Sequence, residues 1–226
     1  MNESPGAMTE TSSGPHAGQP ILWRGRSLRD ARLIAILVHG RGGSAEDILQ
    51  LADEVNVPDV AYAAPQAAGR TWYPKSFLAP IEQNEPGISS GMWVLADLIG
   101  QVQREGILPD RVALVGFSQG ACLALEFAAR NPRRYAAVVG LSGGLIGPPG
   151  TPRNYSGSLQ QTPVLLGCSD IDPHIPLDRV LESEDVLKAL GAAVDARIYP
   201  RMSHTINEDE MNAMHALLTN APLLAD

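Results

Sequence analysis

The chain is poor in cysteine, aromatic residues and positive charge, and each shortage excludes a class of protein. Two cysteines, Cys122 and Cys168, are too few for the disulfide framework of a small secreted protein. Aromatic residues make up only 5% of the chain, so its core must be mainly aliphatic. Lys and Arg number 17 against 25 Asp and Glu, which gives a formal net charge of −8. Since such a charge repels phosphate backbones and anionic membranes, we expect no nucleic-acid partner.

Long apolar runs and targeting signals are missing too. No apolar stretch is long enough to cross a bilayer, so no stable membrane insertion is expected. Residues 1–20 are rich in Ser, Gly, Pro and Thr and lack the basic and apolar regions of a signal peptide. We expect this segment to be a disordered tail, residues 21–226 to form a single domain, and the protein to be cytoplasmic.

What the chain does contain is an alternation of short apolar runs with longer helical patterns. Most of the runs are continuously apolar, as in parallel strands that are covered on both faces. The runs are Leu33–Val38, Val60–Ala63, Val112–Val115, Ala136–Leu141, Val164–Leu166 and Val194–Ile198. Helical spacing of apolar residues marks Ser44–Val55, Met92–Val102, Gln119–Arg130 and Met211–Leu218. The alternation predicts an α/β fold with a mostly parallel sheet and helices on both faces.

Two irregular segments interrupt this alternation. Pro65–Gly87 holds several aromatic residues among prolines, and Ser142–Gln161 is rich in Gly, Pro and Ser. Both follow predicted strands, at the sheet edge where α/β proteins bind ligands, so we expect functional loops.

The strongest motif is Gly116-Phe117-Ser118-Gln119-Gly120, which stands between a predicted strand and a predicted helix. This is the context of a G-x-S-x-G nucleophile elbow. The glycines let the backbone turn tightly around the serine, and the helix aims its positive end at the reacting oxygen. Ser118 is therefore the predicted nucleophile.

A serine nucleophile needs a histidine base and an acid that orients it, in the chain order Ser, acid, His. Of the three downstream histidines, His215 falls on the apolar face of a helix and His174 is too close to Asp172 to fold back onto it. His204 lies in a loop after the last predicted strand and is the predicted base. Either Asp170 or Asp172 could accept its N–H; Asp172 is preferred because two prolines stiffen its segment.

The oxyanion hole should combine the backbone N–H of Gln119 with one from the loop His39-Gly40-Arg41-Gly42-Gly43, most simply that of Arg41. His39 is expected to brace this loop. The Arg41 side chain could favour anionic substrates, although a solvated arginine needs no such role. The loop lacks the Gly-Lys-Ser/Thr of a P-loop and the G-x-G-x-x-G of a dinucleotide site, which argues against nucleotide binding.

These residues together resemble the phospholipase/carboxylesterase family of α/β-hydrolases, which includes acyl-protein thioesterases and small bacterial esterases. The resemblance rests on His39-Gly40, the Gly116–Gly120 elbow, Asp172-Pro173-His174-Ile175-Pro176 and the His204 loop. It implies an α/β-hydrolase fold without a large cap domain, no metal or cofactor, and a homodimer as one arrangement. It also supports Asp172 as the acid. Arg41 departs from the family pattern, in which an apolar residue is usual at this position. Trp72-Tyr73-Pro74 resembles a bacterial esterase subgroup rather than the depalmitoylating members.

The sequence therefore predicts a serine carboxylesterase that acts on small to medium carboxylic esters. An apolar substrate pocket is expected from Trp72, Tyr73, Phe77, Ile175 and Met202, although ordinary packing would explain the same residues. An acyl thioesterase or lysophospholipase with the same triad is the nearest alternative. A non-catalytic ligand-binding protein on the same fold is the alternative from another class.

Overall fold

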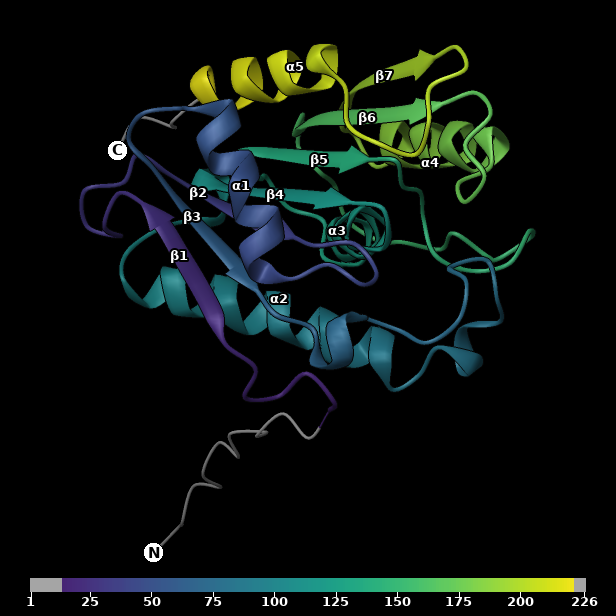
Figure 1. Cartoon of the computed structure of the whole chain (residues 1–226), viewed down its shortest axis with the longest axis horizontal. Coiled ribbons are helices and arrows are strands. Elements are labelled where there is room, and N and C mark those ends of the chain that lie inside the picture. Colours follow the sequence, from purple (N-terminus) through teal and green to yellow (C-terminus); the bar gives the residue numbers. More distant parts are fainter. Residues whose placement is uncertain (1–13, 222–226) are drawn as a thin grey trace, which may run out of the picture.

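A computed structural model describes residues 14–221, and its centre is a seven-stranded sheet (Figure 1). The strand order is β1-β3-β2-β4-β5-β6-β7, and every neighbouring pair is parallel except β1 with β3. The strands are β1 (Ile21–Gly25), β2 (Leu33–Val38), β3 (Val60–Pro65), β4 (Val112–Phe117), β5 (Ala137–Leu141), β6 (Pro163–Ser169) and β7 (Ala193–Tyr199). The predicted α/β fold with a mostly parallel sheet is confirmed.

The sheet is covered on both faces, as the continuous apolar runs predict. Every residue of β2, β3 and β5 is buried, because side chains that alternate between the two faces meet helices on either side. Helices α1 (Ala45–Val55) and α5 (Glu208–Thr219) cover one face. Helices α2 (Gly87–Arg104), α3 (Gln119–Arg130) and α4 (Leu177–Ala189) cover the other. Three short 3₁₀ helices lie at Ala68–Arg70, Ile81–Gln83 and Pro109–Arg111.

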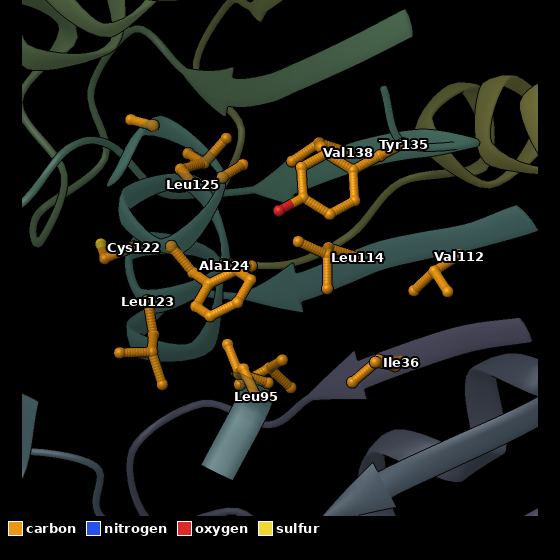
Figure 2. Close-up of a cluster of buried hydrophobic side chains, with 14 of the residues drawn as sticks. Ile36, Leu95, Val112, Leu114, Cys122, Leu123, Ala124, Leu125, Tyr135 and Val138 are labelled. Carbon is orange, nitrogen blue, oxygen red and sulfur yellow. The ribbon is translucent and has the colours of Figure 1, made fainter. Parts of the chain in front are cut away.

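Each face of the sheet has its own aliphatic core. Figure 2 shows the core beneath α2 and α3, where Ile36 and Leu114 of the strands face Leu95 and Leu123 of the helices. These four side chains are fully buried. At about 2–3 kcal/mol for each large aliphatic side chain, such burial is the main force that holds the sheet and its helices together. The core fixes the strand ends from which the candidate site is built.

The segment from Gly14 to Pro20 does not match the expected disordered tail. His16 is buried: its Nδ1 accepts a hydrogen bond from the Ala68 N–H at 3.1 Å, and its Nε2 lies 2.8 Å from the carbonyl oxygen of Trp72. The expected boundary at residue 20 is thus too late, because a buried histidine ties the segment to the domain. The rest of the expected tail, residues 1–13, lies outside the described residues.

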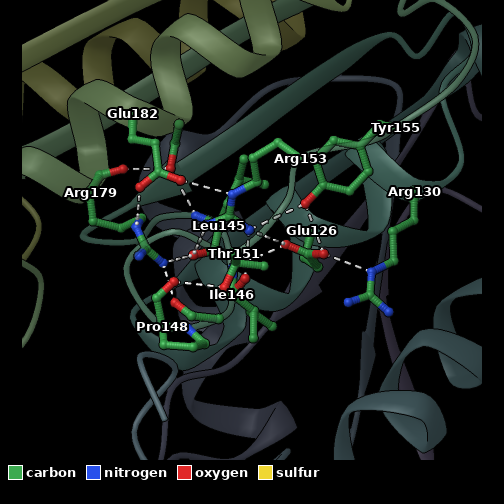
Figure 3. A network of polar contacts seen from close by, with 12 residues as sticks. Glu126, Arg130, Leu145, Ile146, Pro148, Thr151, Arg153, Tyr155, Arg179 and Glu182 are labelled. Carbon is green, nitrogen blue, oxygen red and sulfur yellow. Dashed lines mark hydrogen bonds and ion pairs between the residues drawn. The ribbon is translucent and has the colours of Figure 1, made fainter. Parts of the chain in front are cut away.

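Ser142–Gln161 is held in place by a buried polar network rather than open to a ligand (Figure 3). Glu126 of α3 is 2% exposed and accepts hydrogen bonds from the Tyr155 hydroxyl and the Ile146 N–H, both within this segment. The network also contains Arg130, Arg153, Arg179 and Glu182. No member of the segment lines the cleft described below, so the expected ligand contact at the sheet edge is not made there.

The helices also bear on membrane association. In the described part of the chain, no helix is long and apolar enough to span a membrane.

Candidate active site

Ser118 occupies a strained turn between β4 and α3. Its backbone has φ 55° and ψ −120°, a conformation that non-glycine residues rarely adopt. The flanking glycines are required by space: a Cβ on Gly116 would lie 2.3 Å from the Gly120 oxygen, and one on Gly120 would lie 2.1 Å from the Val38 oxygen. The turn therefore presses α3 against the end of β2 and presents the Ser118 side chain above the sheet, as the elbow motif predicts.

Three side chains that are far apart in sequence form one hydrogen-bonded chain. Ser118 Oγ lies 2.8 Å from His204 Nε2, and His204 Nδ1 lies 2.7 Å from Asp172 Oδ2. The three residues follow β4, β7 and β6, whose carboxyl ends share one edge of the sheet. The Asp172 side chain is fully buried, whereas that of His204 is 18% exposed. The structure thus brings together the serine, histidine and aspartate that the sequence pairs.

Asp172 is held as a charged group. Burial opposes its ionisation, but hydrogen bonds from His204 and from the N–H groups of His174 and Ile175 outweigh burial and lower the pKa of this carboxyl below its ordinary value. The two N–H groups donate to Oδ1 at 2.8 and 3.0 Å, which leaves Oδ2 for the imidazole. The carboxylate is therefore both ionised and fixed in orientation.

The neighbouring carboxylate, Asp170, has a different role. Its Oδ1 accepts a hydrogen bond of 2.7 Å from the N–H of Arg201. This bond ties the loop after β6 to the turn that leads to His204. Of the two candidate acids, only Asp172 reaches the imidazole, and Asp170 helps to hold the loop that carries it.

Two other rings lie close to the His204 ring. Phe117, the elbow residue before the serine, has its ring centroid 5.1 Å from that of His204, and the His174 ring meets the His204 ring edge-on at 4.9 Å. His215, by contrast, lies on the exposed side of α5 and donates from Nδ1 to the Val55 oxygen at 2.7 Å. It is not buried on an apolar face as expected, but it takes no part in the site.

Two backbone N–H groups near Ser118 have no partner among the described residues. Gln119 is the first residue of α3, so its N–H has no acceptor within the helix. The N–H of Arg41 makes no hydrogen bond in residues 14–221. Gly40 lies beside Ser118, since a Cβ there would be 3.3 Å from the serine Cβ. The loop that carries Arg41 is thus packed next to the serine.

His39 braces that loop, as predicted. Its Nε2 accepts a hydrogen bond of 3.1 Å from the Ala67 N–H, so the proton must sit on Nδ1, which donates to the Gly40 oxygen at 2.8 Å. Burial lowers the pKa of His39, which is consistent with this neutral form. Trp72 Nε1 donates to the His39 oxygen at 2.9 Å and braces the same loop from the other side.

Side chains of Gln119 and Arg41 hold the first irregular segment over the site. Gln119 accepts from the Trp72 N–H and donates to the Tyr73 oxygen, both at 2.8 Å. The Arg41 guanidinium donates to the Thr71 hydroxyl and to the backbone oxygens of Pro74 and Lys75. The two residues expected to supply oxyanion N–H groups therefore also position one wall of the cleft, a role that the sequence did not reveal.

A cleft of about 580 Å³ opens above Ser118. Of the predicted pocket residues, it is lined by Tyr73, Phe77 and Ile175. Trp72 does not line it, because its indole is fully buried and bonded to His39. Met202 does not line it either: its sulfur accepts a hydrogen bond from Asn207 at the start of α5. Lining residues that the sequence analysis missed are Gly40, Pro74, Lys75, Ser76, Phe117, Cys122 and His174.

Both cysteines are free and buried. Burial raises the pKa of each thiol to about 12, so neither is a thiolate at neutral pH. Within residues 14–221, no group of three or more His, Cys, Asp or Glu side chains could hold a metal ion.

Known proteins resemble the chain over most of its length. The sequence profile of the phospholipase/carboxylesterase family matches residues 27–221. A solved phospholipase/carboxylesterase from Dyadobacter fermentans is 36% identical, with a TM-score of 0.87 over 92% of this chain and 99% of its own. The solved esterase PE8 is 26% identical, with a TM-score of 0.71 over 90% of this chain and 98% of its own.

Curated relatives match over a shorter length. Acyl-protein thioesterase 1 of Gibberella zeae is 29% identical over 142 residues, which are 60% of this chain and 59% of that protein. The chain spans between 48% and 60% of the length of the first curated relatives it matches. The family profile, which covers most of the chain, shows that the chain belongs to the phospholipase/carboxylesterase family of α/β-hydrolases.

Proposed function

We propose that the chain is a serine carboxylesterase that hydrolyses small to medium carboxylic esters through Ser118, His204 and Asp172. The observation that carries the proposal is the hydrogen-bonded chain of these three side chains, with the serine on a strained elbow beneath an open cleft. The solved esterases of similar fold and sequence support the same reaction.

The proposed reaction is a two-step acyl transfer. Ser118 Oγ attacks the ester carbonyl carbon while its proton passes to His204 Nε2. The bond from carbonyl carbon to alcohol oxygen then breaks, and His204 gives the proton to the leaving alcohol. Water attacks the acyl group on Ser118, His204 takes a proton from the water and returns it to Ser118 Oγ, and the carboxylic acid leaves. Asp172 fixes the imidazole and stabilises its charged form throughout.

The N–H groups of Arg41 and Gln119 are the proposed oxyanion donors. Both lie next to Ser118 and have no partner among the described residues, and the positive end of α3 adds to their effect. Losing one such donor costs roughly 3 kcal/mol of transition-state stabilisation.

The test is hydrolysis of p-nitrophenyl esters with acyl groups of two to twelve carbons. We expect Ser118→Ala to lower turnover about 10⁶-fold, because the nucleophile is lost. Ser156→Ala, the same change at an exposed serine outside the cleft, is the matched control and should keep wild-type rates. The proposal is wrong if wild type hydrolyses no ester or if Ser118→Ala keeps its rate.

An acyl thioesterase with the same triad is the second candidate, favoured by the match to acyl-protein thioesterase 1 of Gibberella zeae. A lysophospholipase would use the same residues. Rates on an ester and a thioester of the same acyl group, measured side by side, distinguish a carboxylesterase from a thioesterase. Saturable ester binding without turnover would instead support a ligand-binding protein.

A further inference from the structure

The charge of the cleft is opposite in sign to that of the whole chain. Acidic residues outnumber basic ones by 25 to 17 in the sequence. The residues that line the cleft nevertheless include two cations, Arg41 and Lys75, and no Asp or Glu. A cleft with this lining attracts anions, and its low-dielectric walls strengthen the attraction.

Neither cation is neutralised by a carboxylate. Within residues 14–221, no Asp or Glu oxygen lies within 4.0 Å of the charged atoms of Arg41 or Lys75. Arg41 bonds only to uncharged oxygens, which hold the guanidinium in place without cancelling its charge. Lys75 is one of only two lysines in the chain, and the other, Lys188, pairs with Glu184 on α4. The unpaired lysine is thus the one at the cleft.

Both cations lie on the same side of Ser118. Arg41 follows β2 and Lys75 belongs to the segment after β3, whereas His204 follows β7 and His174 follows β6. In the sheet order, β4 and its serine stand between the β3-β2 side and the β6-β7 side. The cleft therefore has a cationic wall and, across from it, a histidine wall.

The proposed reaction assigns one half of the ester to each wall. The leaving alcohol oxygen receives its proton from His204 Nε2, so the alcohol must extend along the histidine wall. The acyl group then extends toward the other wall, where Tyr73 and Phe77 line the cleft beside Arg41 and Lys75. A negative charge that meets these cations is carried by the acyl group.

We propose that the substrates are half-esters of dicarboxylic acids, bound with the free carboxylate of the acyl group against Lys75 and Arg41. This inference rests on the esterase function proposed above. Hydrolysis releases the dicarboxylate and the alcohol with one water consumed, by the two acyl-transfer steps already described. Lys75 is a specificity-determining residue in this arrangement, since its ammonium is free to pair with the carboxylate.

The test compares monoethyl adipate with ethyl hexanoate, two ethyl esters with six-carbon acyl groups that differ in the terminal carboxylate. Acid release is followed by titration at constant pH 7.5. We expect wild type to show a kcat/KM about tenfold higher for monoethyl adipate, as two cations attract the carboxylate. Lys75→Met should reduce this preference about fivefold, mainly through KM, and added salt should weaken it in wild type.

Lys188→Met is the matched control, because it removes the only other lysine, which lies on α4 and does not line the cleft. It should keep the wild-type preference. Equal rates on the two esters in wild type, or an unchanged preference in Lys75→Met, would overturn the inference while leaving the esterase function intact. The hexanoate ester of 4-hydroxybutanoate carries its carboxylate on the alcohol instead. Faster hydrolysis of this ester than of monoethyl adipate would also overturn the inference. A chain that hydrolyses none of these esters and no p-nitrophenyl ester would refute the esterase function itself.

Discussion

Two aspartates only two residues apart, Asp170 and Asp172, show how fully the surroundings of a side chain decide its role. Asp172 is buried and accepts from the His204 imidazole, whereas Asp170 is exposed and accepts from a backbone N–H. We expect Asp172→Asn to lower kcat on a p-nitrophenyl ester by about 10⁴, because an amide cannot hold the imidazole in the required tautomer. Its Oδ1 still accepts the N–H groups of His174 and Ile175, so the loop should keep its shape.

Asp170→Asn is the matched variant for this measurement. Its amide oxygen can still accept from the Arg201 N–H, so we expect kcat to stay within about tenfold of wild type. Thermal unfolding of both variants checks that neither loss comes from a misfolded chain. A larger loss of kcat in Asp170→Asn than in Asp172→Asn would reverse the assignment of the acid.

At the same scale, the hydrogen-bonded arrangement of Ser118, His204 and Asp172 could be predicted from sequence and the cleft lining could not. Ser118, Asp172 and His204 stand in a fixed chain order at the ends of recognisable strands, so local patterns find them. Trp72 was expected in the pocket, but a hydrogen bond to the His39 oxygen turns its indole into the core. Lys75 was not expected there, because the direction of its segment is set by Arg41 and Gln119, distant in sequence.

Among the elements, strands with a continuous apolar run were predicted to within a few residues, whereas one strand and one α-helix were missed. Strand β1 is only half-buried and pairs antiparallel at the sheet edge, so it lacks the apolar run of a covered strand. Helix α4 buries Arg179 and Ser183 beside Val180 and Leu187, so half of its buried stripe is polar. Apolar periodicity cannot find a helix whose inner face bonds to a loop, as Arg179 does to the Leu145 and Gly147 oxygens.

Helix α5 begins with a buried carboxyl that makes the stability of the protein depend on pH. Glu210 is fully buried and completes the capping box with Asn207, but its Oε1 has no hydrogen-bond partner in the described part of the chain. Burial raises its pKa to about 7, from an ordinary value of 4.5. Between these two pH values the folded protein binds more protons at this site than the unfolded chain, so its contribution to stability falls as pH rises.

We expect Glu210→Gln to remove that part of the pH dependence, because glutamine can keep the capping box and carries no charge. At pH 8 the variant should be more stable than wild type by roughly 1–3 kcal/mol, and the gain should vanish near pH 4.5. Urea unfolding between pH 4.5 and 8 measures the difference. Glu208→Gln, an exposed residue in the same first turn, is the control. Parallel pH profiles for Glu210→Gln and wild type would contradict the prediction.

Across the whole molecule, the N-terminal segment and the candidate site are joined through one buried tryptophan. The Trp72 indole lies close to the rings of both His16 and His39, with ring centroids 5.2 Å apart in each pair. His16 Nδ1 accepts from the Ala68 N–H, so its proton sits on Nε2 and is donated to the Trp72 oxygen. Burial lowers the pKa of both histidines. Protonating either one would cost this arrangement an acceptor that a backbone N–H uses.

These two histidines should make the folded state lose stability in mild acid. Below about pH 6.5 the unfolded chain takes up a proton on each histidine, while the folded protein does so only at lower pH. Stability therefore falls as pH decreases, by up to about 1.4 kcal/mol per pH unit for each histidine. His16→Gln should remove one of these contributions and make the fall less steep.

Urea unfolding at pH 8 and pH 5 tests this, with the histidine change made in the Glu210→Gln background so that the opposing slope of that carboxyl is absent. The difference between the two chains at pH 8, where the histidines are uncharged in both states, gives the structural cost of the substitution alone. The part of the difference that appears only at pH 5 then belongs to the His16 proton. If the His16→Gln chain loses as much stability between pH 8 and pH 5 as its parent, the buried imidazole does not carry the acid sensitivity. In that case the acid sensitivity of the fold must come from groups other than His16.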